Sequence, residues 1–327
     1  MSKGSIYCVD KDLGYRTKAN LCLVQEYNGI CRKLVTDSRG RIVGKNSIHD
    51  QYRLMLAGGS WAEGFFYNWK YTVAGFLSEH TSSVASIGVS GYSLLQIVRR
   101  IKQESKFNSN GDMIILYDSV HVDMVGRRLF NHVLSRPVII QSLFGYKLIE
   151  SNNLSESLLK VYRKLSGKNN HNVLLFIRFI AKIMNGALGY KVKSFFIKKF
   201  RQSMAGKSGD DFHYRKYILD TCMGKLDEIA IKNNIKIHIF ANPIIPGRTN
   251  INSAKFDSQY FDKNEYSKIN YYSNINHGMT TAWSKYLKRK GYKYSDVTSK
   301  LLHTDGKHPN ILGYNLMSMY IREQLKI

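Results

Sequence analysis

The amino-acid sequence predicts an α/β fold, a three-layer α/β/α sandwich built on a doubly wound sheet. Short, continuous apolar runs recur along the chain and indicate strands that are buried on both faces. Helical patterns separate these runs, and turn residues follow several of them. Alternation of strand and helix places helices on both faces of one sheet. In such sheets the functional site lies outside the carboxyl ends of the strands.

Four apolar runs are predicted to form the strands of this sheet. The first stops at Gly58-Gly59, the second at Gly88, and the last just before Asn242-Pro243, and such residues commonly end strands. The four predicted strands are residues 52–57, 84–87, 113–117 and 235–240.

Helical patterns lie between the predicted strands. A helix-like stretch begins at Ala62, and residues 94–102 carry apolar side chains at helical spacing. A longer helix is predicted near residues 211–233, directly before the last of the four strands.

Turn signals and charge divide the chain into three parts. Residues 1–50 alternate short apolar runs with turns such as Asn28-Gly29, which predicts a β-rich N-terminal extension. Residues 51–327 form the predicted main domain. Within it, residues 127–207 hold 16 Lys and Arg against two acidic residues, and are predicted to be a basic, mainly helical insertion.

The whole chain is strongly basic, with 49 Lys and Arg against 24 acidic residues and a formal net charge of +25. Such a surface attracts polyanions, although codon usage in an AT-rich genome is an alternative source of the lysines. The insertion at 127–207 has two interpretations: a helical segment with a solvated basic face, or an amphipathic helix that contacts an anionic membrane or an acidic glycan. Nucleic acid is the least favoured partner, because no reader motif accompanies the charge.

The location of the protein follows from what the sequence lacks. The first thirty residues have no positively charged start and no apolar run of the signal-peptide kind. No apolar stretch approaches the roughly 18–20 residues of a membrane span. A cytoplasmic protein is therefore expected, with peripheral membrane association left open.

Neither a metal nor a cofactor is expected. The four cysteines show no zinc spacing; reduced thiols are expected, with one disulfide near the N-terminus as the alternative. The sequence also lacks a phosphate-binding Gly-x-x-x-x-Gly-Lys loop and a dinucleotide fingerprint. The cysteines are Cys8, Cys22, Cys31 and Cys222.

Ser60 is a candidate nucleophile because it follows two glycines at the end of a predicted strand. Glycines let the chain turn tightly and bring a backbone N–H beside the hydroxyl. The start of the following helix would also favour developing negative charge. The alternative is that Ser60 simply caps that helix.

A second candidate motif, Asp305-Gly306-Lys307-His308-Pro309, lies near the other end of the sequence. Asp305 and His308, three residues apart in a turn, can hydrogen-bond, which leaves the other imidazole nitrogen free to accept a proton. The alternative is a solvated turn that precedes a helix.

Together the two motifs resemble those of the SGNH (GDSL-like) hydrolase family, which read Gly-Asp-Ser-x-x-x-Gly and Asp-x-x-His-Pro. Residues 87–93 resemble the family's second block, Gly-Val-x-Gly-Tyr, whose first glycine, here Gly88, donates its N–H to the oxyanion. Residues 12–16 and 39–41 resemble the leader of members associated with bacterial surface glycans. Residues 294–298 resemble the family's final strand. The resemblance implies a mostly parallel, flavodoxin-like sheet.

Two residues depart from the family pattern. Gly59 replaces the Asp of Gly-Asp-Ser, with little expected loss because the resemblance assigns the triad acid to Asp305. The third block, Gly-x-Asn-Asp in the family, is replaced by residues 118–123 and has no asparagine. His121 is the favoured replacement for that oxyanion donor, Ser119 is a second candidate, and a histidine satisfied at a strand end is the alternative.

The resemblance implies a serine esterase that hydrolyses O-acyl esters, O-acetyl esters in particular, on a carbohydrate. Ser60 is then the nucleophile, His308 the base and Asp305 its orienting acid, while Ser60, Gly88 and His121 form the oxyanion hole. Two alternatives use the same residues: an O-acyltransferase, and a catalytically degenerate relative that binds glycan or anionic membrane.

Overall fold

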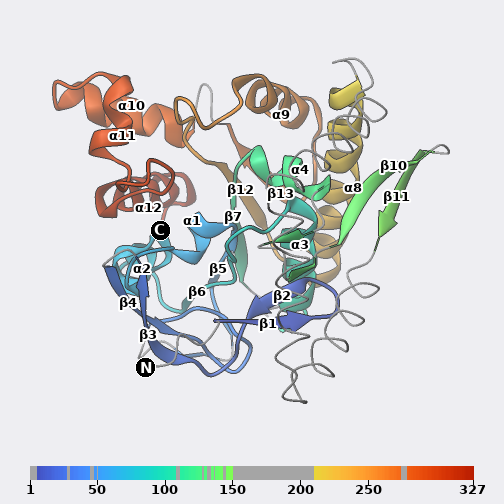
Figure 1. The fold of residues 1–327 in the computed structure, drawn as a ribbon, viewed down its shortest axis with the longest axis horizontal. Helices are drawn as coiled ribbons and strands as arrows, with labels where there is room; N and C mark the ends of the chain where they lie inside the picture. The colour runs from blue at the N-terminus through green and yellow to red at the C-terminus, as the bar shows by residue number, and fades with distance from the viewer. Residues whose placement is uncertain are drawn as a thin grey trace, which may run out of the picture.

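A five-stranded parallel sheet forms the centre of the protein (Figure 1). Its strands are β5 (Leu54–Gly58), β6 (Val84–Ser86), β7 (Asp112–Tyr117), β12 (Ile237–Ala241) and β13 (Ile269–Tyr272). All neighbouring strands pair in parallel, in the spatial order β13-β12-β7-β5-β6. Counted along the chain this is the 2-1-3-4-5 order of a flavodoxin-like, doubly wound sheet, so the predicted fold class is confirmed. The computed structural model describes residues 6–27, 30–44, 48–49, 51–107, 111–126, 129–130, 134–135, 137–142, 145–149, 210–273 and 278–327.

Helices cover both faces of the sheet because its strands are apolar on both sides. Along β7, Met113, Ile115 and Tyr117 enter one core, whereas Ile114 and Leu116 enter the other. This alternation has the period of two expected of a strand. One core is shared with α3 (Leu94–Ser105), α8 (Asp210–Asn233) and α9 (Ile251–Lys263). The other is shared with α2 (Val73–Ser78), α10 (Met279–Arg289) and α12 (Ile311–Leu325).

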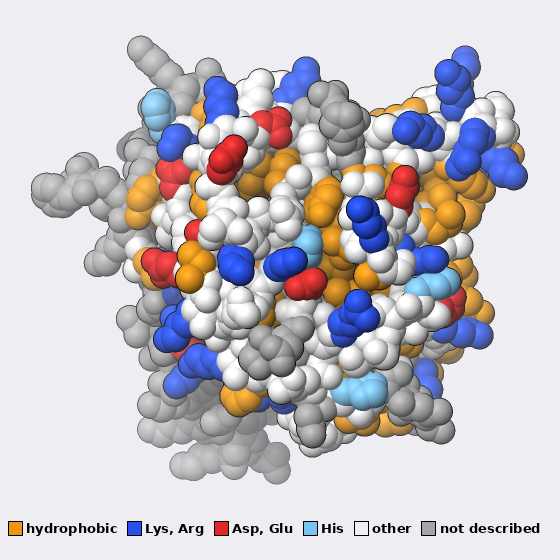
Figure 2. Space-filling model, turned by 180° about the vertical axis from the view of Figure 1, so that it is seen from behind, with side chains coloured by type: hydrophobic (Ala, Val, Ile, Leu, Met, Phe, Trp, Pro, Cys, Tyr) orange, Lys and Arg blue, Asp and Glu red, His pale blue; other side chains and the backbone are white. Residues whose placement is uncertain are grey.

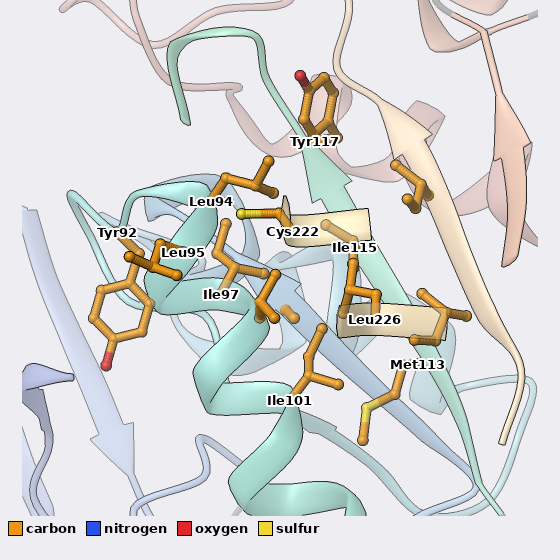
Figure 3. Packing of buried hydrophobic residues seen from close by; sticks show 14 of the residues in the cluster. Tyr92, Leu94, Leu95, Ile97, Ile101, Met113, Ile115, Tyr117, Cys222 and Leu226 are labelled. Atoms are coloured by element: carbon orange, nitrogen blue, oxygen red, sulfur yellow. The ribbon is translucent and has the colours of Figure 1, made fainter. Parts of the chain in front are cut away.

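The core between α3, α8 and the sheet is closely packed (Figure 3). Ile97 and Ile101 of α3 face Met113 and Ile115 of β7, and Leu226 of α8 lies beside them. The helical spacing of the apolar residues in 94–105 thus reflects burial against one face of the sheet.

The N-terminal part forms two antiparallel hairpins, β1 (Tyr7–Asp10) with β2 (Gly14–Thr17) and β3 (Cys22–Tyr27) with β4 (Ile30–Val35). An antiparallel bridge from Ile42 to Ser86 joins this part to the edge strand β6. The four cysteines are free thiols.

The segment 294–298, predicted to be the final strand, is not a strand. It forms a 3₁₀ helix, η3 (Tyr294–Asp296), and continues into α11 (Val297–Lys300). The Asp296 carboxylate accepts the Lys293 N–H at 3.2 Å, a contact typical of a helix start. The fifth strand is instead β13, which pairs with the edge of β12.

The segment 127–207 was predicted to be mainly helical, which is wrong for its described part. The described residues between 129 and 149 pair as two small antiparallel sheets, β8 (Leu129–Phe130) with β9 (Leu134–Ser135) and β10 (Val138–Ser142) with β11 (Gly145–Ile149). Short runs of β-branched and aromatic residues in 138–149, with Gly145 between them, suit a hairpin better than a helix. The rest of the predicted insertion, with its basic and phenylalanine-rich end, lies outside the described residues.

Four short helices complete the described elements: α1 (Ser60–Glu63), η1 (Trp69–Tyr71), α4 (Val120–Asp123) and η2 (Met124–Gly126). In the described part of the chain, no helix is both long enough and apolar enough to cross a membrane.

Candidate active site

Ser60 lies at the carboxyl end of β5, at the first residue of α1. Gly58 adopts φ +148°, and a Cβ there would lie 2.9 Å from the Leu116 carbonyl oxygen, so the turn requires glycine. Gly59, not Ser60, is the N-cap of α1. The hydroxyl of Ser60 therefore does not cap the helix, contrary to the alternative interpretation of the sequence.

His308 lies between Ser60 and Asp305. Its Nε2 lies 2.8 Å from Ser60 Oγ, and its Nδ1 lies 2.6 Å from Asp305 Oδ2. The backbone N–H groups of Lys307 and His308 both donate to Asp305 Oδ1, which fixes the carboxylate within the turn. With Nδ1–H donated to Asp305, Nε2 is free to accept the proton of the Ser60 hydroxyl.

The electrostatic surroundings keep His308 neutral and Asp305 ionised. Burial lowers the pKa of His308 below its ordinary value, and Arg248 adds to this, while Asp305 opposes both. Burial would raise the pKa of Asp305, but hydrogen bonds from His308 and from two backbone N–H groups outweigh it and lower that pKa. A neutral imidazole beside an ionised carboxylate is the form in which histidine acts as a general base.

Aromatic side chains hold this arrangement in place. The rings of Phe65 and Phe66 lie 5.3 and 5.2 Å from the His308 ring. Trp61 Nε1 donates to the Lys307 carbonyl at 3.0 Å, which ties α1 to the turn that carries His308. The Trp61 ring is stacked on Trp283 of α10, with centroids 6.3 Å apart. Motifs from opposite ends of the sequence are thus joined by direct contacts.

His121 lies beside Ser60, with its ring against Gly59. A Cβ on Gly59 would be only 2.8 Å from His121 Nε2. The N–H of Asp118 donates to His121 Nδ1 at 3.1 Å, so the neutral ring carries its proton on Nε2. Burial lowers the pKa of His121 to about 4, with Arg248 adding to the shift and Asp118 opposing it. Nε2 is therefore an uncharged hydrogen-bond donor in the wall of the cavity that Ser60 also lines.

Gly88, expected to donate to the oxyanion, is placed elsewhere. Its N–H donates to the Ser86 hydroxyl at 3.1 Å, and its Cα faces Ala62 of α1. Because the Gly88 N–H already donates to Ser86, it is not free to bind an oxyanion at Ser60. The assignment of Gly88 to the oxyanion hole is therefore wrong. Gly91, three residues further on with φ +77°, lines the cavity at Ser60 instead.

The cavity beside Ser60 brings together residues that the sequence pattern did not single out. Its volume is about 30 Å³. It is lined by Gly59, Ser60, Trp61, Gly91, Tyr92, Asp118, Val120, His121, Met124, Asn242 and Arg248. Asn242 directly follows β12, so its place at the carboxyl edge of a predicted strand was the signal that could have identified it. Arg248, in the loop after β12, gave no comparable signal.

The described residues contain no group of three or more His, Cys, Asp or Glu that could hold a metal ion.

Comparison with known proteins finds no matching family model and no matching curated protein. Among solved structures, the chain is similar to TesA with a TM-score of 0.43 and 8% identity, over 84% of this chain and 97% of that chain. It is also similar to a protein from Streptococcus pneumonia, solved as a candidate platelet activating factor, with a TM-score of 0.42 and 10% identity over 86% of each chain. Both similarities are weak, and the candidate site rests on the contacts within this chain.

Proposed function

We propose that the protein is a serine hydrolase of the SGNH kind that cleaves O-acyl esters, O-acetyl esters in particular, on a carbohydrate. The observation that carries the proposal is the position of His308, whose two ring nitrogens lie 2.8 Å from Ser60 Oγ and 2.6 Å from Asp305 Oδ2. A nucleophile, a base and an orienting acid within hydrogen-bonding distance are what nucleophilic acyl transfer requires.

In the proposed reaction, His308 takes the proton of Ser60 as Oγ attacks the ester carbonyl. The tetrahedral oxyanion is stabilised by the N–H of Ser60 and by His121 Nε2–H, both of which are uncharged donors. His308 then protonates the departing sugar oxygen, which breaks the C–O bond and leaves an acyl group on Ser60. Water then attacks this acyl group as His308 takes one of its protons. The bond from the acyl carbon to Ser60 Oγ breaks, His308 returns the proton to Oγ, and the acid is released.

The size of the cavity favours a short acyl group. Its volume of about 30 Å³ exceeds the roughly 10–15 Å³ that one water molecule needs. A methyl group therefore fits this space. The carbohydrate part of the proposal rests on the sequence resemblance to members associated with surface glycans.

A panel of esters assayed with matched variants tests the proposal. Wild-type protein should hydrolyse 4-nitrophenyl acetate and acetylated sugars, and 4-nitrophenyl decanoate much more slowly. Ser60→Ala should abolish hydrolysis, whereas Ser299→Ala, which alters an exposed serine of α11, should not. Hydrolysis that persists in Ser60→Ala would overturn the assignment of the nucleophile, and an inactive wild type would indicate a degenerate relative.

The transferase alternative is separated by adding an unacetylated sugar to the same assay. Transfer of the acetyl group to its hydroxyl in preference to water would make the protein an O-acyltransferase. Both reactions share the acyl group on Ser60, so the same variants serve as controls.

A further inference from the structure

Arg248 is a cation at the cavity beside Ser60 whose hydrogen-bonding capacity is unused. Its guanidinium makes no hydrogen bond to any residue within the described ranges, and its Nη1 is buried without a partner. The nearest carboxylate, Asp118 Oδ2, lies 3.9 Å from Nη2, beyond hydrogen-bonding distance. Asp118 therefore offsets the charge of Arg248 but accepts none of its five N–H groups.

The guanidinium is nevertheless held in a defined place. Its Cζ lies 5.2 Å from the centre of the Trp61 ring, and that ring is fixed by Trp283 and by the Lys307 carbonyl. The backbone around Arg248 is closed by hydrogen bonds from Arg248 N and Thr249 N to the Ile245 carbonyl. When an arginine stacks on an aromatic ring, the N–H groups at the edge of its planar guanidinium stay available to a carboxylate or a phosphate.

Asn242 adds a second unused polar group to the same cavity. The residue is 5% exposed, and within the described part of the chain its Oδ1 has no hydrogen-bond partner. Buried polar groups without partners are rare in folded proteins, and those that persist commonly serve a function. Asn242 and Arg248 both belong to the segment that follows β12, so one loop supplies both groups.

We infer that this loop recognises an anionic group on the substrate, so that the ester cleaved at Ser60 belongs to an acidic sugar. Arg248 binds the carboxylate or phosphate of that sugar, and Asn242 hydrogen-bonds a neighbouring hydroxyl or N–H. This inference rests on the proposed ester hydrolysis. The net charge of +25 attracts anionic substrates in general. The guanidinium of Arg248 then favours those whose carboxylate or phosphate can form hydrogen bonds with it.

The test compares acetylated glucuronic acid with acetylated glucose, which differ only in a carboxylate in place of a hydroxymethyl group. Wild-type kcat/KM should be at least about tenfold higher for the acidic ester, since a charge-assisted hydrogen bond contributes on that scale. Arg248→Gln should bring this ratio close to one, and Arg248→Lys should keep part of it. Arg289→Gln, which removes the same charge from an exposed position of α10, should keep the full ratio.

Acetylated glucose phosphate forms a third arm that separates the two sources of the anion. If kcat/KM is higher for the phosphate ester than for the carboxylate ester, and Arg248→Gln removes this difference, the anion site is supported and phosphate is its ligand. An equal kcat/KM for all three esters, or a ratio that Arg248→Gln leaves intact, would overturn the inference while leaving ester hydrolysis in place.

Binding of the two esters to the Ser60→Ala variant tests the anion site independently of catalysis. Calorimetry should show tighter binding of the acidic ester than of the neutral ester, and Ser60→Ala/Arg248→Gln should remove the difference. If the wild type hydrolyses nothing but Ser60→Ala retains this preference, the proposed function fails and the anion site stands. If Ser60→Ala binds both esters equally, the anion site fails.

Discussion

At the scale of single residues, the protonation of His308 governs the proposed reaction. Only the neutral ring can accept the Ser60 proton, and burial together with Arg248 lowers the pKa of His308. The rate should therefore rise with pH through this lowered pKa and then level off. The acid-side midpoint of kcat/KM for 4-nitrophenyl acetate, measured between about pH 4 and pH 8, should lie below the ordinary histidine value of about 6.5.

Arg248→Gln provides the matched comparison for this pH profile. Removal of a neighbouring positive charge makes the imidazolium easier to form, so the midpoint should move to higher pH. A midpoint that stays in place would show that Arg248 and His308 do not interact.

Ser60 and His308 should behave as one unit in kinetics. Ser60→Ala and His308→Ala should each remove nearly all hydrolysis, and the double variant should be hardly worse than either. Comparison of kcat/KM for the four proteins on one ester measures this. Losses that multiply would mean that the two residues act in separate steps.

Gly59 and His121 should be coupled by their close contact. Gly59→Ala places a Cβ 2.8 Å from His121 Nε2 and should displace this donor, lowering kcat by about 100-fold or more. His121→Ala should have an effect of similar size, and Gly59→Ala should then add little to it. A double-mutant cycle on kcat, with the open helical position Gly224→Ala as control, measures the coupling.

Sequence motifs pointed to Ser60, Asp305 and His308 as candidate reacting residues because all three lie in short local patterns. The motifs did not point to Asn242 or Arg248, which reach the cavity from the loop after β12. The assignment of an oxyanion donor to Gly88 failed for a related reason. Only the hydrogen bond from the Gly88 N–H to the Ser86 hydroxyl shows that this N–H is not available to the site.

At the scale of elements, a buried ion pair connects the N-terminal hairpins to α1, the helix that begins at Ser60. Arg32 of β4 donates to Glu63 of α1 at 2.8 Å, and the two side chains are 4% and 0% exposed. Tyr7 and the N–H of Ser90 also donate to Glu63, at 2.8 and 2.6 Å. The hairpins, α1 and the loop after β6 therefore meet at one carboxylate.

Glu63→Gln should destabilise the protein by about 3–5 kcal/mol, because it leaves the buried Arg32 without its counter-charge. Urea-induced unfolding measures the change, with the exposed Glu79→Gln as control. Arg32→Met/Glu63→Leu should lose less than the sum of the two single losses. Additive losses would mean that the pair does not act as a pair.

Elements were predictable from sequence where burial dictates a simple pattern. The strands β5, β6, β7 and β12 are continuous apolar runs, and each was placed within a few residues. The edge strand β13 was missed because Ile269-Asn270-Tyr271-Tyr272 is short and only partly apolar, and edge strands lack neighbours on one side. In segment 294–298, the capping contact of Asp296 favoured a helix over the predicted strand.

At the scale of the whole molecule, the excess of positive charge is unevenly distributed. Figure 2 shows Lys and Arg side chains gathered at the upper right, above apolar side chains, in the region of α10. A groove there is lined by Lys285, Lys288, Arg289 and Arg322 together with Met319. A second concentration, outside the described residues, is the basic end of the segment 127–207.

Binding to anionic liposomes should depend on salt and on the segment 127–207. We propose that its interleaved Phe and basic residues contact anionic lipid or acidic glycan. Lys193, Lys198, Lys199 and Arg201 changed together to Gln should weaken binding, and so should a rise from low to physiological salt. The same loss of charge at Lys285, Lys288, Arg289 and Arg322 is the control and should weaken it less. If the two variants bind equally, attraction depends on total charge alone.

The stacked tryptophans can serve as an intrinsic spectroscopic probe of the candidate site. The chain has three tryptophans, and two of them, Trp61 and Trp283, are stacked at the edge of the candidate site. Arg248 lies over Trp61, so an occupant that draws the guanidinium away changes the electric field at that indole. Intrinsic fluorescence and near-ultraviolet circular dichroism can therefore follow the filling of the cavity in unlabelled protein, and a stopped-flow trace can separate binding from bond cleavage.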